Sequence, residues 1–140
     1  MNTIDNNQFD HNYYEDAYYN KSAWQASIKP LNTLYIFTGM YIGTNTELGQ
    51  KSFLDFINTL VETDQIPKAI AFWNESVEAC IETSQAIDSL IKLEKLGVKI
   101  ILCSSAVTKL NLQSCIRVGK LANHFDLIHE INSAQKVINF

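Results

Sequence analysis

The chain has 140 residues and a formal net charge of −4 at pH 7, from 11 basic and 15 acidic side chains. The basic residues form no run, so neither nucleic acid nor an anionic membrane surface is an expected partner. An apolar fraction of 46% and a charged fraction of 19% are typical of one globular domain with a buried core. No stretch has the length and apolarity of a membrane span or a secretion signal, so the expected location is the cytoplasm.

The first thirty residues differ in composition from the rest of the chain. Residues 1–30 are rich in Asn, Asp and Tyr and contain almost no aliphatic side chains. Such a segment cannot bury enough apolar surface to fold alone, so we expect a disordered or loosely docked arm. Its tyrosines also suit a partner-binding segment, which is the alternative interpretation.

Short apolar runs, typical of buried strands, recur after Pro30. Strands are expected at 34–37, 69–73, 98–102, 116–118 and 136–139. They alternate with segments of helical periodicity over the whole of 31–140. This alternation predicts one α/β domain, a three-layer α/β/α sandwich with a mainly parallel sheet.

Helix boundaries follow from capping residues. The sequence Thr44–Glu47 fits a capping box that opens a first helix of about four to five turns. Thr83 or Ser84 is expected to cap a second helix, which Gly97 ends in a left-handed conformation. A third helix is expected over about 122–131. The stretch between the third strand and 116 shows no regular pattern.

Cys103 directly follows the apolar strand 98–102. In a parallel sheet, ligands bind in the crevice beyond the carboxyl ends of the strands, so a thiol at this place can be functional. A free cysteine is also commonly a small buried hydrophobe, and that alternative stays open.

Other polar residues are expected at the same edge of the sheet. Asn74 follows the second strand and could donate a hydrogen bond, or it could simply form a turn. The backbone N–H groups of Ser104 and Ser105 could stabilise a thiolate or persulfide anion. Asn123 and His124 stand at the amino end of the last helix, where His124 could exchange a proton or belong to the helix cap. We take these five residues as candidate substrate-binding residues around Cys103.

Cysteine and histidine spacing predicts no metal site. The three cysteines stand at 80, 103 and 115, and in the cytoplasm they are expected to be reduced. Neither they nor the three histidines form a zinc pattern. We therefore expect no metal ion and no cofactor.

From Leu34 to Phe140 the chain resembles the DsrE/DsrF-like sulfur-relay family, in particular the C-terminal domain of the YedF selenium-metabolism proteins. The resemblance spans about three quarters of the chain with little or no gap. The stretches that carry it are Glu47-Leu48-Gly49, Phe72-Trp73-Asn74-Glu75-Ser76-Val77, Leu93 to Cys103, and Val118-Gly119-Lys120-Leu121-Ala122-Asn123-His124-Phe125.

The resemblance implies a five-stranded α/β/α domain that assembles into homo-oligomers and carries sulfur as a cysteine persulfide. Two features depart from the YedF pattern. Cys103-Ser104-Ser105-Ala106 stands in place of Cys-Gly-Thr-Cys, so the second cysteine is missing, and the polar arm replaces an N-terminal sulfur-carrier domain. The first thiol is retained, whereas a role in selenium metabolism does not follow.

The sequence is therefore compatible with three functions. In the first, a sulfurtransferase or sulfur carrier, Cys103 accepts sulfane sulfur from a donor protein and passes it to an acceptor protein. In the second, a redox protein, Cys80 pairs with Cys103, which requires their Cα atoms to lie within about 7 Å. In the third, a binding or assembly module without catalysis, Cys103 is buried and of ordinary reactivity.

Overall fold

The computed structural model describes residues 28–140. The prediction of a disordered or docked arm concerns residues 1–30 and therefore lies almost wholly outside the described residues. Five strands are present: β1 (Leu31–Phe37), β2 (Pro67–Phe72), β3 (Lys99–Cys103), β4 (Lys120–Ala122) and β5 (Lys136–Asn139). They form one sheet in the order β4-β3-β2-β1-β5, and every neighbouring pair is parallel.

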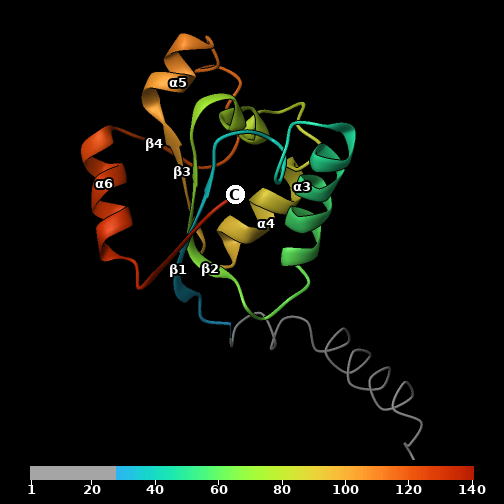
Figure 1. Ribbon diagram of the computed structural model, residues 1–140. Helices are drawn as coiled ribbons and strands as arrows, with labels where there is room; N and C mark the ends of the chain where they lie inside the picture. The colour runs from blue at the N-terminus through green and yellow to red at the C-terminus, as the bar shows by residue number, and fades with distance from the viewer. Residues whose placement is uncertain (1–27) are drawn as a thin grey trace, which may run out of the picture.

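Helices cover both faces of this sheet. Helices α3 (Glu47–Leu60) and α4 (Ile87–Lys95) pack on one face, and α6 (His124–Ser133) packs on the other (Figure 1). The helix α5 (Ser104–Lys109) and the 3₁₀ helix η1 (Asn74–Cys80) lie at the carboxyl edge of the strands (Figure 1). The predicted three-layer α/β/α sandwich with a parallel five-stranded sheet is confirmed.

The two faces of the sheet carry side chains of different size, because successive residues of a strand point to opposite faces. Toward α3 and α4 the strands present large groups such as Phe37 and Phe72. Toward α6 they present smaller groups, among them Ala69, Ala71 and Cys103. Leu127 of α6 packs into this second cluster, so α6 covers this face of the sheet.

Two predicted helix caps were wrong by a few residues. Helix α3 begins after Thr46, not Thr44, and the Thr46 hydroxyl accepts a hydrogen bond from the Gly49 N–H at 3.1 Å. Helix α4 follows Ala86, which provides no side-chain cap. The Ser84 hydroxyl instead accepts from the Ala86 N–H at 3.1 Å, and this closes a turn before the helix. Polar residues in a connecting loop can form either turns or caps, and the sequence does not distinguish the two.

The predicted strand at 116–118 was also wrong, and the stretch after Cys103 is more regular than expected. That stretch opens with α5, and Ile116 forms only an isolated antiparallel bridge with Ile81. The strand next to β3 begins later, after Gly119, whose φ is +88°. A Cβ at Gly119 would lie 2.5 Å from Cδ1 of Leu102, so this glycine lets the chain approach β3 closely enough to pair.

No helix of residues 28–140 is long and apolar enough to cross a membrane.

Candidate functional site

The candidate site lies at the carboxyl edge of the sheet, on the side that α6 covers. All strands are parallel, so the ends of β2 and β3 and the start of α6 meet at this edge (Figure 1). The segments after β2 and β3 lie at the same edge, as expected from the sequence, and they form η1 and α5.

Cys103 is the last residue of β3 and the N-cap residue of α5. Its thiol is free and makes no capping hydrogen bond. The residue is 6% exposed and belongs to the apolar cluster between the sheet and α6, together with Ala122 and Leu127. The thiol is therefore nearly covered by apolar neighbours, at the edge where the sheet meets solvent.

Trp73 is a member of this site that the sequence did not identify as such. It directly follows β2, is half-buried, and packs against the same cluster as Cys103. The ring of His124 meets it edge to face, with 6.0 Å between the ring centroids. Among the buried side-chain nitrogen and oxygen atoms of residues 28–140, Nε1 of Trp73 is the one that has no hydrogen-bond partner. The sequence feature that could have identified Trp73 as a site residue is its position at the end of a strand, directly before Asn74.

The serines after Cys103 form the first turn of α5. Ser104 is half-buried and Ser105 is exposed. Their backbone N–H groups belong to the first turn, which has no intrahelical acceptors, so these groups remain available as donors beside Cys103.

The two asparagines already have structural roles. Asn74 is exposed and has φ of +53°, so it makes the left-handed turn from β2 into η1. The Asn123 side chain accepts a hydrogen bond from the Asp126 N–H, and the Asp126 carboxylate accepts one from the Asn123 N–H. This capping box fixes the start of α6 and therefore the position of His124, which is exposed on the first turn.

The other two cysteines lie away from Cys103. Cys80 is fully buried in the cluster on the opposite face of the sheet, against α3 and α4. Burial raises the pKa of its thiol, and the negative charge of Glu94 raises it further. Cys115 is half-buried in the turn after α5. Cys80 and Cys103 are both free and belong to different clusters, so the geometry gives no support to a disulfide between them.

The described part of the chain contains no group of three or more His, Cys, Asp or Glu side chains placed to hold a metal ion.

Comparison with known proteins gives similarity of fold. No protein-family profile and no curated protein sequence matches the chain. Among solved structures, the YchN protein from E. coli superposes with a TM-score of 0.60 at 15% sequence identity, covering 77% of this chain and 98% of YchN. At 15% identity, this match shows similarity of fold and does not show a shared function. The chain therefore shares the five-stranded parallel α/β fold of YchN.

Proposed function

We propose that the protein takes part in sulfur relay and carries sulfane sulfur as a persulfide on Cys103. The observation that supports this most is the place of the free Cys103 thiol: the carboxyl end of a central strand, directly before the first turn of α5. Ligands of open α/β sheets bind at this edge, and helix amino ends favour anions. The DsrE-like fold is consistent with the proposal.

The chemistry is an exchange between thiols and persulfides. The Cys103 thiolate attacks the outer sulfur of a donor protein's persulfide, so that a new S–S bond forms on Cys103 while the donor's S–S bond breaks. The donor leaves as a thiol, its proton coming from solvent or from His124. An acceptor protein's thiolate then attacks the same outer sulfur and releases Cys103. No net oxidation occurs, and no cofactor is needed.

The neighbours of Cys103 have defined tasks in this proposal. The free N–H groups of Ser104 and Ser105 stabilise the persulfide anion. His124 supplies the proton that the departing donor thiol takes up, and Asn74 donates a hydrogen bond to the donor's persulfide. Because Cys103 is only 6% exposed, transfer requires local opening of the segment around α5, and it is slower than at an open thiol.

The test is intact-mass analysis of the full chain after incubation with a small persulfide donor. The wild type and Cys80→Ala should each gain one sulfur atom, which a reductant removes, whereas Cys103→Ala should gain none. Cys80 is a suitable control because it is fully buried on the other face of the sheet. Absence of the adduct in the wild type, with Cys103 also unreactive toward iodoacetamide in the folded protein, would reject sulfur carriage.

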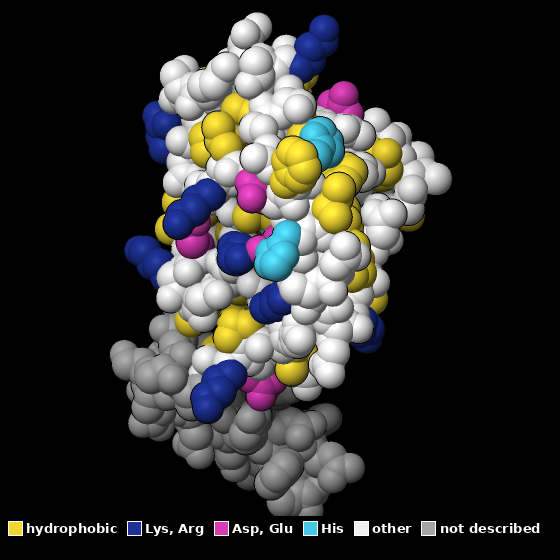
Figure 2. Space-filling model, turned by 90° about the vertical axis from the view of Figure 1, so that its left-hand side faces the viewer, with side chains coloured by type: hydrophobic (Ala, Val, Ile, Leu, Met, Phe, Trp, Pro, Cys, Tyr) yellow, Lys and Arg dark blue, Asp and Glu magenta, His cyan; other side chains and the backbone are white. Residues whose placement is uncertain are grey.

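A second candidate is a binding module that assembles with further copies of itself. Figure 2 faces α6 and shows exposed apolar side chains gathered near the histidines of this face. Phe125 is 84% exposed, and Leu121 and Ile128 are each more than half exposed. Phe125 and Ile128 are three residues apart on α6, and we call them the α6 stripe; Leu121 belongs to β4. Exposed apolar groups that lie together mark protein interaction surfaces, and the burial of Cys103 is compatible with a function that uses no thiol.

Assembly is tested by the oligomeric state in solution. Phe125→Ser should lower the molar mass measured by light scattering after gel filtration, because it removes the most exposed member of the α6 stripe. Leu48→Ser is the matched control, since Leu48 is 74% exposed but lies on α3, across the sheet. A wild type that is monomeric at high concentration would rule out assembly through this stripe.

A further inference from the structure

A cleft of about 680 Å³ opens at the carboxyl edge of the sheet, on the face opposite Cys103. Its walls come from the loop after β1, the first half of α3, η1 and the segment that leads into α4. This volume lies within the range of small-molecule sites. The cleft is separate from the α6 side of the sheet, where Cys103, Trp73 and His124 lie.

Two acidic side chains lie on the wall of the cleft. Glu75 and Glu78 line it from η1, and no Lys, Arg or His of the described residues lines it. A 3₁₀ helix has about three residues per turn, so residues 75 and 78 stand one above the other on the same side of η1. Neither glutamate forms an ion pair within residues 28–140. The two carboxylates therefore give the cleft a negative field that the described chain does not neutralise.

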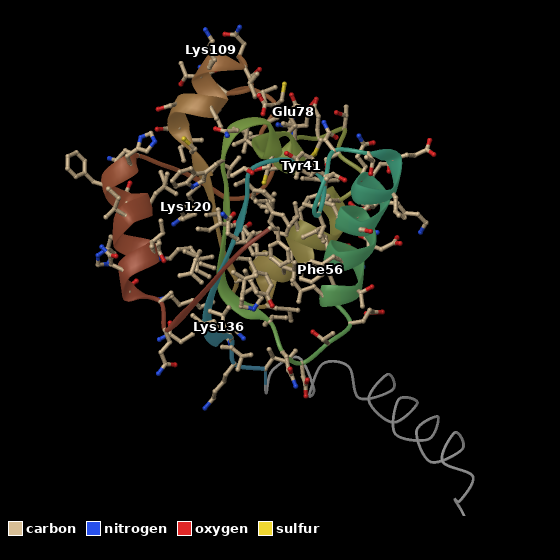
Figure 3. The ribbon with its side chains drawn as sticks, viewed as in Figure 1. Tyr41, Phe56, Glu78, Lys109, Lys120 and Lys136 are labelled. Carbon is tan, nitrogen blue, oxygen red and sulfur yellow. The ribbon has the colours of Figure 1, made fainter. Side chains whose placement is uncertain are left out.

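Apolar groups also line the cleft. Phe53 and Leu54 come from α3, and Met40 and Tyr41 come from the loop after β1. Figure 3 shows Tyr41 and Glu78 at the same edge of the molecule, so an aromatic ring and a carboxylate border one space. Uncharged polar groups complete the lining: Asn45, Gln50, Thr83, Ser84 and Gln85.

The wall that bears Tyr41 is held in place by close packing. The ring of Tyr41 lies over Gly39 so closely that a Cβ there would be 2.2 Å from the ring atom Cε2. The same loop is tied to α3, since the Ile42 N–H donates to the Gly49 carbonyl at 3.0 Å. A Cβ at Gly49 would lie 2.0 Å from the carbonyl oxygen of Thr44. Two glycines thus allow the loop to pack down, and the cleft is preformed.

We propose that this cleft binds a small organic cation, with an ammonium group between Glu75 and Glu78 and an apolar body against Leu54 and Tyr41. A cation suits the unpaired carboxylates and gains further from the face of an aromatic ring. An anion would meet two like charges with no basic group to offset them. An inorganic cation would not contact the apolar residues of the cleft. We therefore expect a ligand that has an apolar part as well as a positive charge.

The experiment uses three probes of the same shape and different charge: 2-phenylethylamine, 2-phenylethanol and 3-phenylpropanoate. Each is titrated into the ¹⁵N-labelled full chain, and the amide resonances are followed. The amine should bind in saturable fashion, with a Kd on the order of 1 mM or tighter and with shifts centred on Tyr41 and Glu78. The alcohol should bind about tenfold more weakly, and the propanoate should not saturate.

Variants separate the charge from the pocket. Glu75→Gln with Glu78→Gln should weaken the amine about fivefold to tenfold, toward the affinity of the alcohol, and leave the alcohol unchanged. Glu62→Gln with Asp64→Asn is the matched control: it removes the same charge from positions after α3, at the other edge of the sheet, and should leave the amine's affinity unchanged.

Three outcomes would overturn the proposal. The first is equal affinity for the amine and the propanoate. The second is a control pair that weakens the amine as much as the glutamate pair does. The third is a set of amine-induced shifts that map away from Tyr41 and Glu78. None of these readouts depends on Cys103 or on sulfur transfer.

Discussion

The imidazole ring of His124 stands at 79° to the indole ring of Trp73, in an edge-to-face contact. This pair joins the end of β2 to the first turn of α6, two segments far apart in the sequence. Because Trp73 also packs on the cluster that contains Cys103, the contact couples α6 to the surroundings of the thiol.

His124→Ala should lower the free energy of unfolding by about 0.5–1.5 kcal/mol, because edge-to-face aromatic pairs contribute about that much. His129→Ala is the control, since His129 is exposed on the same helix and should change the free energy by less than about 0.5 kcal/mol. Urea unfolding of both variants measures the difference. Equal losses would show that the ring contact contributes nothing beyond helix propensity.

Leu127→Ala should destabilise the protein by about 2–5 kcal/mol, because Leu127 is 1% exposed and fills the space between α6 and the sheet. Leu48→Ala removes the same side chain from a 74% exposed position of α3 and should cost less than about 0.5 kcal/mol. Chemical denaturation followed by far-ultraviolet circular dichroism compares the two. A small effect at Leu127 would mean that α6 is not packed on the sheet as described.

Two glycines with positive φ should respond differently to alanine. Gly43 has φ of +82°, and a Cβ added there would have no atom within 4 Å, so Gly43→Ala should cost only the backbone penalty of about 1–2 kcal/mol. At Gly119 the same penalty applies, and the new Cβ would also meet Leu102 and the Ile100 carbonyl oxygen at 3.0 Å or less. Gly119→Ala should therefore lower Tm clearly more than Gly43→Ala. The reverse order would contradict the close approach of the segment before β4 to β3.

Stability should fall above about pH 8.5, because Cys80 is buried in its neutral form. Burial raises the pKa of Cys80 in the folded protein, whereas an unfolded thiol ionises near pH 8.5. Above that pH the unfolded chain binds fewer protons than the native one, so its free energy is lowered relative to the native state. The full contribution is present below the unfolded pKa and is lost progressively as pH rises from that value toward the raised pKa of the folded protein.

Cys80→Ala isolates this contribution. The wild type should lose up to about 1.4 kcal/mol per pH unit from Cys80 between about pH 9 and pH 10, and Cys80→Ala should show a correspondingly shallower decline. Guanidinium unfolding at several pH values measures both slopes. Parallel declines in the two proteins would mean that Cys80 stays protonated in the unfolded chain or ionises in the folded one.

Much of the fold could be predicted, because the central strands are buried on both faces and appear as short apolar runs. The strand that ends at Cys103 is the clearest case, and the left-handed end of α4 at Gly97, with φ of +105°, was also predicted. The strand β4 could not be, since Lys120 and Leu121 are exposed and only their pairing with β3 makes them a strand. Here tertiary contact decides the structure, not local propensity.

The site was predictable in part for a similar reason. Parallel topology alone brings Cys103, Asn74 and His124 to one edge. The face that Cys103 occupies follows from the alternation of side chains along β3, but Cys80 lies in η1, and the packing of that helix on the other face could not be predicted from the sequence. The cleft beside Tyr41 depends on the packing of the Tyr41 ring over Gly39. The hydrophobic pattern of the sequence does not predict this contact.

The position of β1 has a consequence for how the chain folds. It pairs on one side with β2 and on the other with β5, so Leu34 lies beside both Ala69 and Val137. During synthesis, β1 can pair with β2 early, but its second edge stays open until nearly all of the described chain has been made. Contacts so distant in sequence close slowly, and an open strand edge can pair with other chains. The interval before β5 docks is therefore the period in which this protein is most exposed to aggregation.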